Sequence, residues 1–123
     1  MEKFTYSFDE KTGIMFKSYF GSITFHDIES SWLSAFEKNI IPQNVTGFIV
    51  DYRKATFDMT PEEHVEIADF YQKHLTVFGN KKIGVITDNA KDVIIPVLVE
   101  RKDNGYISRP FSTVDAAILW IIS

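Results

Sequence analysis

Apolar residues in this chain change their spacing repeatedly, and the order of those changes limits the folds that the chain can adopt. Phe4, Tyr6 and Phe8 alternate with polar residues. A second alternating run follows at 14–20, after a short turn that ends in Gly13. A period of two indicates strands with one apolar face, and two such runs joined by a short glycine-containing loop are typical of an antiparallel hairpin. The sequence therefore predicts a hairpin at the start of the chain.

The first helical pattern begins after the segment GSIT at 21–24. Its apolar residues recur every three or four positions: Phe25, Ile28, Trp32, Ala35 and Phe36, with Leu33 and Ile40 widening the stripe. Thr24 is expected to cap this helix, with Asp27 completing a capping box. Pro42 ends the pattern, because its ring cannot continue a helix.

A second helix is predicted between a strand at 47–53 and a strand at 82–87. Thr60 is its expected cap, Pro61 takes the first helical position, and Glu63 completes a capping box. The stripe expected to face the core is Val65, Ala68, Tyr71 or Gln72, Leu75 and Phe78. Neighbouring apolar residues in the strand at 47–53 predict a central strand that is covered on both faces.

Residues 93–99, VIIPVLV, allow two interpretations. Their β-branched residues, followed by the turn DNG at 103–105, could form a hairpin with the segment YISRPF. The alternative is a helix capped near Asp88 or Asp92, in which Pro96 removes one hydrogen bond. We favour the helix because it continues the alternation seen in the rest of the chain.

The whole order reads strand, strand, helix, strand, helix, strand, helix, short strand, helix, and the last helix follows the segment FST at 111–113. Alternation of this kind predicts an α/β fold: a mixed, mostly parallel sheet with an N-terminal antiparallel hairpin and about four helices. A length of 123 residues, 45% of them hydrophobic, suits a single domain over 1–123.

Composition narrows the classes of function. The net charge of -4 argues against a nucleic-acid partner, which requires a clustered positive field. The chain has no cysteine, so disulfides, thiolate nucleophiles and cysteine-based metal sites do not occur. We expect a cytoplasmic protein without a transmembrane segment, because no apolar signal core opens the chain and no apolar run of 18 residues occurs.

Four segments together resemble the SpoIIAA-like, or STAS, domain family. They are GSIT, FIVDYRKATF, GVITDNAKD and FSTVDAAILW, in the same order as in the family and following the same opening hairpin. The resemblance implies a SpoIIAA-like fold in a small stand-alone member. It also implies roles that do not require catalysis: antagonists of anti-sigma factors, regulatory domains of transporters and sensors, and proteins that bind small ligands or lipids.

In the antagonist branch of that family, a strand ending in Asp is followed by the pattern D-S-S/T-G, whose hydroxyl is phosphorylated by a partner kinase. Asp51 matches the strand-end Asp, and the four residues from Asp58 to Pro61 fall where the pattern would lie. The resemblance makes Thr60 the candidate phosphoacceptor. Two departures weaken it: Met59 replaces a hydroxyl residue, and Pro61 replaces the glycine.

Polar residues follow the predicted parallel strands, whose carboxyl ends are the usual ligand-binding edge of an α/β sheet. The candidates for binding a partner or ligand there are Asp51, Arg53, Thr56, Asp58, Asp88 and Asn89. Capping of helices and a polar strand end explain the same residues without a ligand. Because several acids would repel a phosphate, we expect a neutral or apolar ligand, with no metal and no cofactor.

Aromatic residues make up 15% of the chain, and this richness also has two interpretations. One is a tightly packed core. The other is an apolar pocket between sheet and helices, lined by Trp32, Phe36, Phe70 and Tyr71. Trp120 near the end of the last helix would suit a contact in a homodimer.

The function predicted from these patterns is a non-enzymatic regulatory or binding domain that acts through protein contacts or an apolar small ligand or lipid. A phosphoregulated switch at Thr60, with a kinase or sensor as partner, is the first alternative. A small enzyme using Asp51, Asp58 or Asp88 as an acid or base is the second. The three histidines do not have the spacing of a helical metal site, and we assign no catalytic residue.

Overall fold

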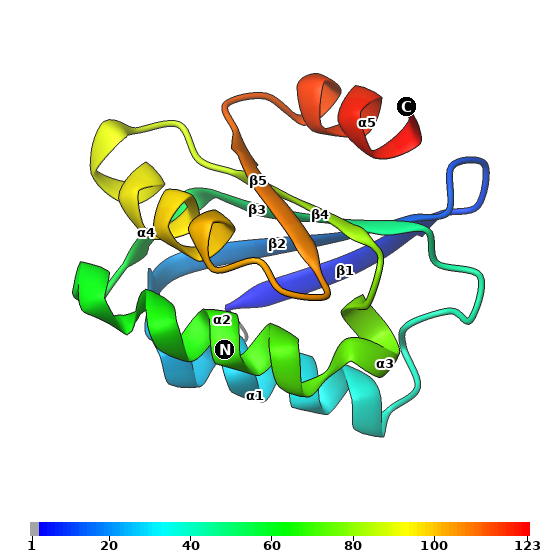
Figure 1. Cartoon of the computed structure of the whole chain (residues 1–123), viewed down its shortest axis with the longest axis horizontal. Coiled ribbons are helices and arrows are strands. Elements are labelled where there is room, and N and C mark those ends of the chain that lie inside the picture. The colour runs from blue at the N-terminus through cyan, green and yellow to red at the C-terminus, as the bar shows by residue number, and fades with distance from the viewer. Residues whose placement is uncertain (1–2) are drawn as a thin grey trace.

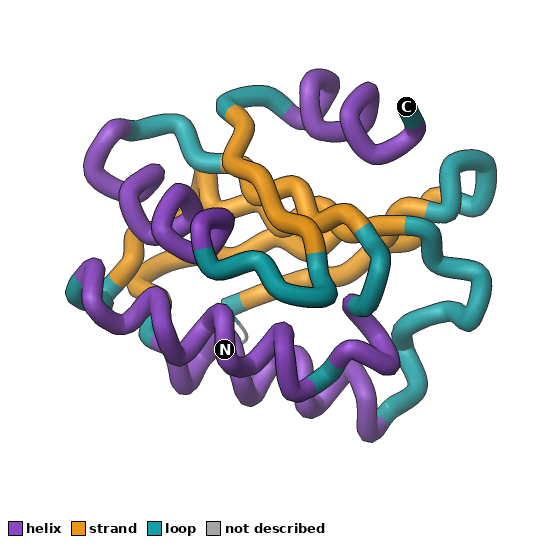
Figure 2. Tube along the Cα trace, in the orientation of Figure 1, coloured by secondary structure: helices purple, strands orange, loops and turns teal. Residues whose placement is uncertain are grey.

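The computed structural model describes residues 3–123, in which five strands form one sheet (Figures 1 and 2). The elements in chain order are β1 (Phe4–Asp9), β2 (Ile14–Ile23), α1 (Phe25–Glu37), β3 (Gly47–Phe57), the 3-10 helix η1 (Pro61–Glu63), α2 (His64–Lys73), α3 (Leu75–Phe78), β4 (Lys82–Ile86), α4 (Ala90–Arg101), β5 (Ile107–Phe111) and α5 (Val114–Ile122). This order confirms the alternation predicted from the sequence, including four helices of nine residues or more.

The strands lie in the order in which they occur in the chain, β1-β2-β3-β4-β5. β1 pairs with β2 in the antiparallel sense, and every later neighbour is parallel. The mixed, mostly parallel sheet with an N-terminal hairpin is therefore confirmed. β3 is longer than predicted, because its residues 54–57 continue to pair with the end of β2 after β4 has ended.

The helices divide between the two faces of the sheet for a topological reason. Each step from β2 to β5 moves one strand in the same direction, so right-handed crossovers place all the connecting helices on one face. The main core accordingly joins Trp32 of α1, Ile67 of α2 and Val99 of α4. α5 follows the last strand and lies on the opposite face, where Ala117 packs over Ile49 and Ile86 (Figure 1).

Helix starts follow the predicted capping chemistry with one correction. Thr24 accepts a hydrogen bond from the Asp27 amide at 3.2 Å, and the Asp27 carboxylate accepts from the Thr24 amide at 2.9 Å, which confirms the capping box. Residues 93–99 are helical, as we favoured. The cap of that helix is Asn89, not Asp88 or Asp92, because its side-chain oxygen accepts the amide hydrogen of Asp92 at 2.8 Å.

The predicted apolar stripes are wrong at four residues, because the side chains of these residues are exposed to solvent. They are Leu33, Ile40, Val65 and Leu75. In α2 the buried stripe is instead Ile67, Ala68, Phe70 and Tyr71. The pattern is shifted because regular α-helix begins at His64, after a 3-10 turn, and breaks near His74 before α3.

Lys17 of β2 is the most unexpected member of the main core, with 1% of its surface exposed. It has no carboxylate partner within the part of the chain that the structure describes. Its ammonium nitrogen donates a hydrogen bond to the Ser31 hydroxyl and lies 3.7 Å from the centre of the Trp32 ring. The rings of Phe4, Tyr6 and Tyr19 surround the same nitrogen. Lys17 therefore sits where β1, β2 and α1 meet.

Candidate functional site

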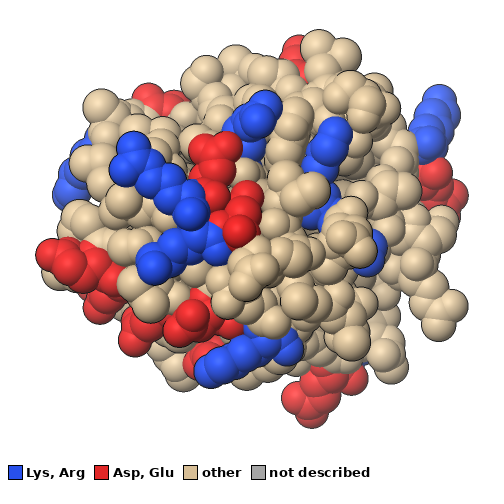
Figure 3. Space-filling model, viewed as in Figure 1, with Lys and Arg blue, Asp and Glu red and all other residues tan. Residues whose placement is uncertain are grey.

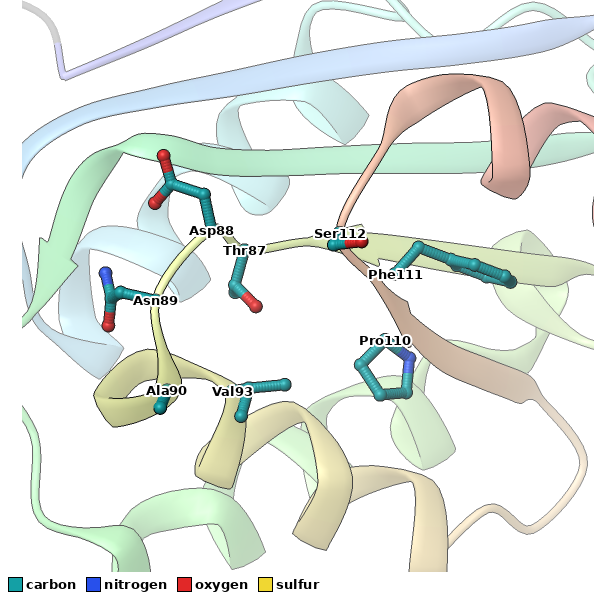
Figure 4. Close-up of a pocket in the computed structure, with 8 residues that line it drawn as sticks. All are labelled: Thr87, Asp88, Asn89, Ala90, Val93, Pro110, Phe111 and Ser112. Atoms are coloured by element: carbon teal, nitrogen blue, oxygen red, sulfur yellow. The ribbon is translucent and has the colours of Figure 1, made fainter.

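A cavity of about 340 Å³ lies between the start of α4 and the end of β5, at the carboxyl edge of the parallel strands. It is lined by Thr87, Asp88, Asn89, Ala90, Val93, Pro110, Phe111 and Ser112 (Figure 4). Its volume falls within the range of small-molecule sites, and this is the edge at which open α/β sheets bind ligands. Two of the predicted binding residues, Asp88 and Asn89, border it.

Thr87 supplies the buried polar group of this cavity. It follows directly on β4, and its amide donates to the Phe111 carbonyl at 3.1 Å, which continues the parallel pairing one residue beyond the strand. The side chain is 4% exposed, and Figure 4 shows its hydroxyl directed into the space between α4 and β5. Val93 and Pro110 face the same space. The cavity thus has an apolar side, formed by Val93 and Pro110, next to the hydroxyl of the buried residue Thr87.

The carboxylate of Asp88 points away from the cavity, toward β3 (Figure 4). On that side lies Arg53, whose guanidinium pairs with Asp51 at 2.8 Å. Burial acts to raise the pKa of Asp51, but hydrogen bonds from Arg53 outweigh it and hold that pKa below its usual value. Asp51 and, more weakly, Asp88 raise the pKa of Arg53. Asp51 and Arg53 form an ion pair beside the cavity, whereas Asp88 borders the cavity with its carboxylate turned toward β3.

Thr56, Asp58 and Thr60 lie apart from the cavity. In the parallel register, Asp51 is level with Ile86, the last residue of β4. β3 continues for six more residues, about 20 Å at the rise of a β-strand. The chain order suggested a single polar edge, but the unequal strand lengths divide the predicted residues into two groups.

The four aromatic residues predicted to line an apolar pocket lie in or against the main core. The Trp32 and Phe36 rings are 6.4 Å apart between centroids, and Phe36 and Phe70 stack at 6.3 Å. Tyr71 borders a narrow apolar cavity of about 20 Å³ between α2, α4 and the sheet. Trp120 packs on Phe111 at 5.4 Å.

Charges are mixed on the face shown in Figure 3, where acidic and basic side chains alternate without a field of one sign. Among residues 3–123, no group of three or more His, Cys, Asp or Glu side chains gathers closely enough to hold a metal ion. No helix in the same range has the length and apolar character required to cross a membrane.

A solved structure of an uncharacterized protein of the DUF3478 family with a SpoIIAA-like fold, from Shewanella loihica PV-4, superposes on this chain with a TM-score of 0.67. The match covers 98% of this chain and 95% of that one. The fold is SpoIIAA-like. This confirms the fold implied by the sequence segments, and at 10% identity the likeness shows the fold alone. No family model and no curated protein sequence matches the chain.

The predicted binding residues include only Asp88 and Asn89 of the cavity lining, and Thr87, Val93 and Pro110 are among the lining residues of this SpoIIAA-like domain that they omit. The sequence pattern places Thr87 at the end of a strand, and Val93 lies in the segment that allows two interpretations. The available signal was the segment TDNA directly after a buried strand, since the residue that ends a parallel strand faces the ligand-binding edge. The sequence predicts the short strand that became β5, but no local pattern shows that Pro110 on it faces the residues after β4.

Proposed function

We propose that this protein is a non-enzymatic binding domain that holds a small, largely apolar ligand in the cavity between α4 and β5. One observation carries the proposal: a cavity of about 340 Å³ at the carboxyl edge of a parallel sheet, with an apolar side and the hydroxyl of the buried residue Thr87 directed into it. The narrower apolar space beside Tyr71, about 20 Å³, is too small for such a ligand. The ligand would contact the two loops that follow β4 and β5.

A fragment screen by protein-observed NMR tests this proposal. Binding compounds are expected to shift the amide signals of residues 87–93 and 110–112. Val93→Trp fills the cavity and should abolish the shifts. Val65→Trp is the matched control, because Val65 is 40% exposed and does not line the cavity. Shifts that survive in Val93→Trp, or a library without any compound that shifts these amides, would contradict the proposal.

A second candidate function is a phosphoregulated switch at Thr60, with a kinase as protein partner. Its support is that Thr60 is exposed and stands directly before η1, where its amide donates to the Glu63 carboxylate at 3.1 Å. A phosphate at a helix start is favoured by the free amides there and would replace the Glu63 contact. Intact-mass measurement of the protein from its own cells, compared with Thr60→Ala, decides this candidate. Phosphate that is absent, or retained in Thr60→Ala, excludes it.

A further inference from the structure

The hydroxyl of Thr87 has no hydrogen-bond partner among the residues that the structure describes. The oxygen itself is not sealed from solvent, because Trp32 Nε1 is the one fully buried side-chain atom without a partner among the described residues. The Thr87 hydroxyl is therefore open to the cavity, where water or a ligand can pair with it. Since Thr87 is 4% exposed and aimed into the cavity, a ligand atom there would supply the missing partner. A hydroxyl can both donate and accept a hydrogen bond, so Thr87 alone does not decide whether the ligand atom is a donor or an acceptor.

The start of α4 decides between donor and acceptor. Asn89 and Ala90 line the cavity, so the N-terminal end of this 12-residue helix borders it. The Asn89 side-chain oxygen accepts a hydrogen bond from the Asp92 amide at 2.8 Å, while the amides of Ala90 and Lys91 have no acceptor within the helix. Free amides and the partial positive charge of a helix start favour a ligand atom that accepts hydrogen bonds.

The charged side chains near the cavity argue against an anion as the ligand group that accepts these hydrogen bonds. Asp92 is 4% exposed, and its carboxylate accepts a hydrogen bond from the Asn89 amide group at 2.9 Å. Asp88 lies on the other side of the same loop, and neither Lys nor Arg lines the cavity. A negative ligand would find no cation in the lining to balance its charge, with the carboxylates of Asp88 and Asp92 in the adjoining loop and first helical turn. A positive ligand would meet the unfavourable end of the helix dipole.

We infer that the cavity binds an uncharged carbonyl compound (an ester, amide or ketone) whose oxygen accepts a hydrogen bond from Thr87 at the start of α4. The alkyl part of the compound contacts Val93, Ala90 and Pro110. This inference rests on the proposed function and adds the chemical class of the ligand. An alcohol that donates to Thr87 is the competing ligand.

Four probes with the same six-carbon body separate these chemistries: methyl hexanoate, 1-hexanol, hexanoate and hexylamine. Their affinities are measured by NMR titration of the amides of residues 87–93. Methyl hexanoate is expected to bind best, and hexanoate and hexylamine about tenfold more weakly because their charges are not balanced in the cavity. If 1-hexanol or hexanoate binds at least as well as the ester, the carbonyl class is wrong.

Thr87→Val tests the hydrogen bond directly, because it replaces the hydroxyl with a methyl group of similar size. Affinity for methyl hexanoate should fall roughly fivefold, the value of one ordinary hydrogen bond. Thr56→Val is the matched control, since Thr56 is exposed on β3 outside the cavity. An unchanged affinity in Thr87→Val overturns the inference but leaves the proposed function standing. Failure of all four probes to shift these amides overturns both.

Discussion

A single lysine shows how strongly surroundings can alter a side chain in this protein. Lys17 is held by the Ser31 hydroxyl and by aromatic rings, the nearest being that of Trp32. The faces of those rings favour the charged ammonium, whereas burial favours the neutral amine. Burial is the larger effect and lowers the pKa of Lys17 to about 6. At neutral pH the folded protein therefore holds this amine largely uncharged.

Replacing Lys17 with methionine is expected to stabilise the fold. The unfolded lysine titrates near 10.5 and the folded one near 6, so the cost of burying it is complete below pH 6 and disappears as the pH rises to 10.5. Lys17→Met should raise the free energy of unfolding at pH 7 by roughly 2–4 kcal/mol, and less at pH 10. Urea denaturation at both pH values measures this.

Lys54→Met is the control for that substitution, because Lys54 is exposed on β3 and should change stability by less than about 0.5 kcal/mol. A less stable Lys17→Met protein at pH 7 would show that the aromatic rings hold the charged form after all.

Among the elements, α5 depends on a close approach to the sheet. Gly84 of β4 lies beneath Ala117, and a Cβ atom at Gly84 would stand 3.0 Å from the Cβ of Ala117. Because α5 is the helix that covers Ile49 and Ile86 on this face, any displacement of α5 uncovers them. The glycine is required here by packing and not by its backbone conformation.

We expect Gly84→Val to lower the free energy of unfolding by about 2 kcal/mol through overpacking against α5. Thermal and urea denaturation measure the loss. Adding Ala117→Gly removes the nearest contact, so the double variant should lose less than the sum of the two single variants. Strict additivity would show that Gly84 and Ala117 do not press on each other.

The start of α1 offers a prediction that depends on local sequence alone. Thr24→Ala removes the acceptor of the Asp27 amide and should cost about 1 kcal/mol of unfolding free energy. Thr76→Ala is the matched control, because Thr76 is exposed in α3 and caps no helix. Equal effects of the two substitutions in urea denaturation would contradict the capping role.

Helix caps and turns depend on residues that are close together in the sequence, which explains why so much of the order of strands and helices could be predicted. Capping by Thr24 and the turn at Gly13 depend on residues within a few positions of each other. The stripe of α2 was wrong for the opposite reason: where a 3-10 turn gives way to α-helix depends on contacts with the rest of the molecule. The cavity residues Thr87 and Pro110 meet across two strands, so no local pattern joins them.

For the whole molecule, the titrating groups together move the pH of greatest stability upward. The folded pKa values of Asp27 and Asp51 are lowered, so their contribution is present above their unfolded pKa and is lost in acid. Lys17 adds a rise in stability from pH 6 to 10.5. Burial raises the pKa values of Tyr19 and Tyr52, so stability falls again once unfolded tyrosines begin to ionise near 10.

We therefore predict maximal stability at about pH 9–10, above the range of about 5–8 that is common for proteins. Urea denaturation at intervals from pH 4 to 11 locates the maximum. In Lys17→Met the free energy of unfolding should no longer rise between pH 6 and 10, and the pH of maximal stability should move toward neutral. A wild-type maximum near pH 7 would contradict the prediction.

The expected homodimer, the cytoplasmic location and the protein partner remain predictions. Trp120 already has contacts within its own chain: the Lys82 and Arg109 cations lie 5.4 Å and 5.2 Å from the centre of its ring. Sedimentation velocity of the purified protein tests the oligomeric state directly.

The order of strands and helices, most helix caps and the mixed sheet could be predicted from the amino-acid sequence, because periodicity and capping act between near neighbours and crossovers have one hand. No sequence pattern predicts that Lys17 is buried among rings, that the Asp88 carboxylate turns away from the cavity, or that Thr87 faces the cavity. These outcomes depend on side chains brought together from distant strands and helices. Their burial and charge are properties of that assembly and not of any segment.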